Sequence, residues 1–105
     1  MHVQINTDSN IDGRERLLAH VTGVVEGALG RFNDRITRVE VHLSDQGGPE
    51  HGPYGKRCMM EARLRGRKPT AVIHDAKTLD RAIEGAVDKL HRSLTRGLAR
   101  LRHHD

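Results

Sequence analysis

The side chains with the clearest chemistry in this sequence are the cations near its end. Lys89, Arg92, Arg96 and Arg100 recur every three or four residues between leucines, and Arg81 precedes them in the same segment. At about 100° per residue, the five cations share an arc of about 100° that points away from the leucine stripe of a helix. Guanidinium forks match phosphate oxygens, so this row predicts contact with a phosphate backbone.

Other uses of a basic amphipathic helix fit this segment less well. A coiled coil would need a longer seam, because this one lasts only about three heptads and lacks patterned flanking charges. A membrane-surface helix would carry Trp or Phe on its apolar face, and residues 78–105 contain neither. A structural role remains open, since the helix macrodipole favours cations in the C-terminal half of any helix.

The net charge of +4 is unevenly divided along the chain. Residues 1–55 hold 5 Lys/Arg and 8 Asp/Glu, whereas residues 56–105 hold 13 and 6. Such a one-sided field attracts polyanions, although a solvated basic surface without a partner explains the asymmetry equally well. The chain has one Phe, one Tyr and no Trp, so it offers no platform for stacking bases. We therefore expect any RNA to be recognised by shape and phosphates, not by base sequence.

Patterns for catalysis and metal binding are missing from the sequence. There is no glycine-rich nucleotide loop, the eight histidines lack ligand spacing, and the acidic residues form no evident inward pair. Cys58 is the only cysteine, and strand alternation points it into the core, where a thiol is inert. We expect no enzyme, no cofactor, no metal and no small-molecule substrate. No signal peptide or membrane span is evident, so a cytoplasmic chain is expected, with a monomer favoured.

Two amphipathic helices and four alternating strands are predicted to position these residues. The strands are predicted at residues 2–6, 36–43, 57–65 and 70–74, and the helices from Asp12 to Phe32 and from Thr78 onward. Asp12 and Thr78 are the predicted caps, with Glu15 at the capping-box spacing from Asp12. The inward face of residues 70–74 stays open, because TAVI is apolar on both parities.

The predicted fold is α+β, a two-layer sandwich in the order β-α-β-β-β-α. Both helices pack on one face of a four-stranded sheet, the last three strands form an antiparallel meander, and the first strand pairs alongside. Residues 1–105 form a single domain, and residues 44–55, rich in glycine and proline, form a flexible loop between the second and third strands.

Two segments, ALGRFNDRITRVEVHL and LDRAIEGAVDKLHRSL, resemble the ribosome hibernation-promoting factor and ribosome-associated inhibitor family, also called the sigma-54 modulation protein family. The resemblance covers nearly the whole chain and is to the short form. It implies a single ribosome-binding domain that binds the small subunit and its ribosomal RNA at the tRNA and mRNA positions of the decoding region. Such a protein blocks translation when growth slows and preserves idle ribosomes.

The resemblance also assigns roles to residues by position. In the second helix, Lys89, Arg92, Arg96, Arg100 and Arg81 would contact ribosomal RNA. In the first helix, Arg16, His20 and Arg31 share a flank and would form the other bank of a groove between the helices. The chain departs from the family in its long 44–55 loop and in the glycines on the outer face of the first helix. The chain ends at Asp105, so we expect no second, ribosome-pairing domain.

A second hypothesis assigns the same fold to another partner. In that case loop 44–55 and the exposed strand residues would bind a different structured RNA or a protein. The strand residues concerned are Arg57, Glu61, Arg63 and Arg65.

Overall fold

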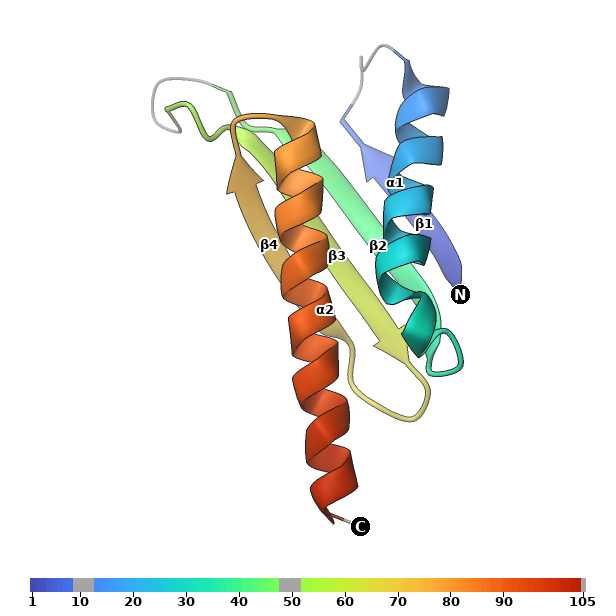
Figure 1. The fold of residues 1–105 in the computed structure, drawn as a ribbon. Helices are drawn as coiled ribbons and strands as arrows, with labels where there is room; N and C mark the ends of the chain where they lie inside the picture. Colours follow the sequence, from blue (N-terminus) through green and yellow to red (C-terminus); the bar gives the residue numbers. More distant parts are fainter. Residues whose placement is uncertain (9–12, 48–51, 105) are drawn as a thin grey trace.

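The structure is a computed structural model. It describes the backbone of residues 1–8, 13–47 and 52–104, and the side chains of these residues through position 99. The elements are β1 (His2–Thr7), α1 (Arg14–Leu29), the 3₁₀ helix η1 (Gly30–Phe32), β2 (Ile36–Asp45), β3 (Lys56–Leu64), β4 (Thr70–Ala76) and α2 (Leu79–His104). Both helices cover the same face of one sheet, and both start from the same end of it (Figure 1). The predicted α+β sandwich and its element order are confirmed.

The four strands form a mixed sheet in the order β1-β2-β3-β4. β1 pairs parallel with β2, placing Val3 opposite Val39, and the β2–β3 and β3–β4 pairs are antiparallel. The predicted meander with the first strand alongside is therefore correct. Because side chains alternate along each strand, this register collects Val39, Val41 and Met60 on the face beneath the helices.

The core lies between that face and the apolar stripes of the two helices. Val21, Val25 and Leu29 of α1 are fully buried, and so are Ile83 and Leu90 of α2. The predicted stripes are therefore the buried ones, which is how each helix is held to the sheet. The fully buried side chains of the sheet include Ile36, Val39, Val41, Leu43, Cys58, Met60 and Ala62.

The structure resolves which face of β4 points inward. Val72 and His74 turn towards α2, whereas Ala71, Ile73 and Asp75 point to the open face of the sheet. Alternation in TAVI could not decide this, because both parities are apolar. Ile73 remains 47% exposed as a result.

The first helix begins later than predicted. α1 starts at Arg14, and Gly13 occupies the N-cap position at φ 72° without a side-chain hydrogen bond. The predicted cap, Asp12, lies outside the described residues. At the other end, the last predicted turn is the 3₁₀ helix η1.

The β2–β3 connection is shorter than the predicted 44–55 loop. Ser44 and Asp45 still belong to β2, where they pair with Arg57 and Lys56 of β3. An ion pair between Lys56 and Asp45 holds the end of this ladder together. Residues 48–51 of the loop lie outside the described residues.

Helix α2 is capped as predicted and runs past the end of the sheet (Figure 1). The Thr78 hydroxyl oxygen accepts a hydrogen bond of 3.1 Å from the backbone N–H of Arg81. Leu94 is buried and Leu98 half-buried, while the side chain of Leu101 lies outside the described residues. None of the described helices is both long enough and apolar enough to cross a membrane.

Candidate nucleic-acid interface

The predicted row of cations lies on the outer surface of α2. Arg81, Lys89, Arg92 and Arg96 are all exposed. Buried Leu90, on the opposite side of the helix, holds the row outward. The side chain of Arg100 lies outside the described residues.

The members of this row differ in what they contact. Lys89 Nζ donates a hydrogen bond of 2.8 Å to the carbonyl oxygen of Ile73, so Lys89 lies against the β4 edge of the sheet. Arg92 Nη2 lies 2.8 Å from Asp88 Oδ2 in an ion pair whose side chains are 63% and 65% exposed. Exposed pairs contribute only about 0–1 kcal/mol, so Arg92 can exchange this carboxylate for a phosphate. Arg96 has no ion pair with any side chain that the structure describes.

The other predicted residues lie in α1, which holds Arg16 and His20, and in η1, which holds Arg31. Arg16 is exposed, and His20 Nε2 lies 3.4 Å from Asp80 Oδ1 at the start of α2. The Arg31 guanidinium lies 5.0 Å from the centroid of the Phe32 ring. Of these three residues, His20 is the one that the described contacts join to α2.

A hollow of about 220 Å³ lies between the end of α1 and α2. Its lining residues are Arg31, Phe32, Asp34, Arg35, Thr95, Leu98 and Ala99. Of the predicted residues, only Arg31 lines it, while Lys89 lies on the opposite flank at the β4 edge. Among the described side chains, this hollow therefore brings no predicted residue of α2 beside Arg31.

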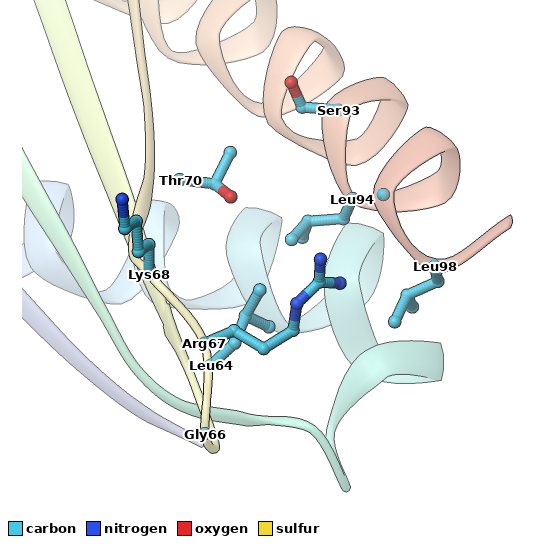
Figure 2. A pocket seen from close by; sticks show the side chains of 9 residues that line it. Leu64, Gly66, Arg67, Lys68, Thr70, Ser93, Leu94 and Leu98 are labelled. Carbon is cyan, nitrogen blue, oxygen red and sulfur yellow. The ribbon is translucent and has the colours of Figure 1, made fainter. Parts of the chain in front are cut away.

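Four further cations gather where the sheet ends, and none of them belongs to the row predicted to contact ribosomal RNA; only Arg65 was named from the sequence, as part of the second hypothesis. Arg35 lies in the α1–β2 connection, while Arg65, Arg67 and Lys68 belong to the β3–β4 turn. Figure 2 shows Arg67 reaching from this turn toward α2, beside Leu94. The run RLRGRK at residues 63–68 is the sequence signal that could have found the turn. We call these four residues the basic turn cluster.

The open face of the sheet carries cations as well, but these are paired with carboxylates. Arg57 makes two hydrogen bonds to Asp75, of 2.8 and 3.1 Å, which raise the pKa of its guanidinium. Arg63 Nε lies 3.2 Å from Glu61 Oε1. Arg38 Nη2 and Glu40 Oε1 are likewise 3.2 Å apart. This face, which the second hypothesis used, therefore has most of its charge balanced within the fold.

Cys58 and the histidines form no reactive site in the described residues. Cys58 is fully buried, and burial raises the pKa of its thiol to about 12, so the nucleophilic thiolate is suppressed. No group of three or more His, Cys, Asp or Glu residues is placed to hold a metal ion in the part of the chain that the structure describes.

Residues 3–102 match the family described as Sigma 54 modulation protein / S30EA ribosomal protein. The fold is similar to that of a ribosomal subunit interface protein from Coxiella burnetii, with a TM-score of 0.69 and 16% identity, covering 94% of this chain and 99% of that one. It is also similar to the N-terminal domain of Protein Y from Thermus thermophilus, with a TM-score of 0.67 and 20% identity over 91% and 98% of the two chains. Among curated proteins, none matches this chain in sequence.

Proposed function

Because this chain belongs to the Sigma 54 modulation protein / S30EA ribosomal protein family, we propose that it binds the small ribosomal subunit in the decoding region and blocks translation there. The family consists of ribosome-associated proteins that are not enzymes, in agreement with the absence of catalytic patterns in the sequence. The interface that we propose is the outer surface of α2, with Arg16 and His20 of α1 and Arg31 of η1 contributing from the side.

The observation that carries this proposal is the exposed cation row on a helix that is rigidly anchored. Buried Leu90 and Leu94 fix α2 to the sheet, so Arg92 and Arg96 are held outward at a spacing of one helical turn. Preorganised arginines lose less entropy when they bind phosphate than mobile ones do. The row therefore suits a rigid, structured RNA surface.

The test removes three charges from α2 and, in a matched control, three charges from the open face of the sheet. The α2 variant carries Arg81→Ala, Arg92→Ala and Arg96→Ala, which leaves the Lys89–Ile73 bond intact. The control variant carries Arg38→Ala, Arg57→Ala and Arg63→Ala, all in ion pairs within the fold.

Binding to purified small subunits is measured by co-sedimentation across a series of salt concentrations. The α2 variant should bind more weakly, and its salt dependence should flatten by roughly 0.7–0.9 log units for each phosphate that the variant no longer neutralises. The control should keep the wild-type slope. If the α2 variant co-sediments as well as the wild type does, the proposed interface is wrong.

A further inference from the structure

A backbone hydrogen bond joins the two segments that make up the basic turn cluster. The Arg65 N–H donates a hydrogen bond of 3.0 Å to the carbonyl oxygen of Arg35, joining the β3–β4 turn to the α1–β2 connection. Gly66 turns the chain at φ 66°, a conformation that other residues rarely adopt. Two segments that are far apart in sequence therefore present their arginines at one end of the sheet.

None of the four cations is neutralised within the described residues. Arg35, Arg65, Arg67 and Lys68 are exposed, and no carboxylate of the described chain forms an ion pair with any of them. This contrasts with Arg38, Arg57 and Arg63 on the open face, which all have carboxylate partners. The turn cluster thus holds positive charge that an external anion can balance.

A recess beside the cluster gives that anion a place to bind. It has a volume of about 300 Å³ and lies between the β3–β4 turn and α2 (Figure 2). Its lining residues are Leu64, Gly66, Arg67, Lys68, Thr70, Ser93, Leu94, Gly97 and Leu98. A second hollow of about 330 Å³ shares Leu64, Arg67 and Leu98 with it and adds Asp34, Arg35 and Arg65. Arg67 is therefore the one cation that lines both hollows.

The lining chemistry matches a phosphodiester. Arg67 and Lys68 supply charged donors, and the hydroxyls of Thr70 and Ser93 add neutral donors on the opposite walls. Leu64, Leu94 and Leu98 supply the apolar part of the lining. Asp34 is the one carboxylate among the residues that line the two hollows.

We propose that the basic turn cluster and its recess grip the phosphodiester backbone of an RNA strand, as a contact separate from the α2 row. The choice of RNA as the phosphate source rests on the proposed function. The two adjoining hollows suit successive phosphates of one strand, which would run past Arg67 around the end of the sheet. An acidic protein is a different partner, and the experiment tells the two apart by using RNA alone.

The test variant carries Arg35→Gln, Arg65→Gln, Arg67→Gln and Lys68→Gln, which removes charge while keeping side-chain length and Gly66. The matched control carries Arg38→Gln, Arg57→Gln, Arg63→Gln and Lys56→Gln, the same charge change on paired cations. Both are compared with wild type in thermal unfolding, in fluorescence anisotropy with a labelled single-stranded RNA of mixed sequence, and in co-sedimentation with small subunits. The α2 triple variant described above is run beside them.

We expect the turn variant to bind RNA about tenfold more weakly than the control at moderate salt, with a shallower salt dependence. If it binds RNA and small subunits like the control while the α2 variant loses binding, this inference is overturned and the proposed function stands. If the turn variant loses binding and the α2 variant does not, the inference stands and the α2 interface is wrong. If both variants bind like wild type, both proposals fail.

Discussion

Gly85 of α2 lies directly against the imidazole ring of His74 in β4. An ideal Cβ at Gly85 would come within 2.0 Å of His74 Cδ2 and 2.4 Å of Cγ, distances that real Cβ atoms do not show. The absence of a side chain at this position is therefore what lets α2 approach β4 so closely. The inward turn of His74 and the height of the helix above the sheet depend on each other.

Replacing Gly85 by alanine should destabilise the fold. The new methyl group must push His74 out of its rotamer or lift α2 from β4, and overpacking of this kind costs typically about 1–3 kcal/mol. Alanine would regain roughly 1 kcal/mol through helix propensity, so the net loss should be up to about 2 kcal/mol. Urea denaturation measures the difference in the free energy of unfolding.

The control for this variant is Gly27→Ala on the exposed face of α1. An added Cβ there meets nothing within 4 Å in the described structure, so we expect a gain of about 0.5–1 kcal/mol. In a His74→Ala background, Gly85→Ala should lose most of its penalty, because the obstructing ring is gone. Equal stability of the Gly85→Ala and Gly27→Ala proteins would refute the packing argument.

Thr78→Ala should cost about 1 kcal/mol of stability, because it removes the hydroxyl that accepts the N–H of Arg81 at the start of α2. Thr95→Ala is the control. The Thr95 hydroxyl donates a hydrogen bond of 2.9 Å to the carbonyl oxygen of His91 one turn earlier in α2, and a bond of this kind slightly destabilises a helix. We expect the control to be neutral or stabilised in thermal unfolding. Thr78→Ser, which keeps the hydroxyl, should restore most of the loss, and a failure to do so would argue against capping.

The fold could be predicted from local periodicity because most elements bury one face only. Val39 and Val41 alternate with polar neighbours, and Leu90 and Leu94 recur at helical spacing. In each case the pattern identifies the face that is buried. β4 was the exception, since TAVI is apolar on both parities. Its orientation follows from the contact between His74 and Gly85, which joins distant parts of the chain and leaves no local signal.

The candidate interface was predictable only where it lies on a single helix. A helical wheel places Arg92 and Arg96 outward without any knowledge of the sheet. It cannot show that Arg65 bonds to Arg35, nor that Arg57 faces Asp75, because both relationships depend on strand pairing. Only the three-dimensional structure therefore shows which cations have carboxylate partners and which do not.

Asp88→Asn should tighten binding to the small subunit. Asp88 is paired with Arg92. If α2 binds RNA as proposed, this carboxylate would compete with phosphate for Arg92 and oppose the approach of RNA. Removing an exposed charge of this kind should change affinity about two- to fivefold, more at low salt than at high salt. Asp75→Asn on the open face is the matched control and should leave affinity unchanged. Equal tightening by both variants would mean that net charge, not position on α2, sets the affinity.

The Cys58 thiol should make stability fall at alkaline pH. Its pKa is raised by burial from the usual value of 9.0 to about 12, so the folded protein keeps a proton that the unfolded chain releases. Between these two values the unfolded state binds fewer protons, and stability decreases as pH rises. The loss attributable to Cys58 should be about 2 kcal/mol by pH ~10.5.

Comparison with Cys58→Ala isolates this contribution from every other effect of alkaline pH on the protein. Near pH 8 the variant should be less stable than wild type by about 1 kcal/mol, since it leaves a small cavity in the core. That difference should shrink and then reverse as pH rises, because the variant has no buried thiol to ionise. A difference that stays constant from pH ~8 to ~10.5 would show that the thiol is not desolvated. Rapid reaction of native protein with a thiol reagent at pH ~8 would contradict its burial in the same way.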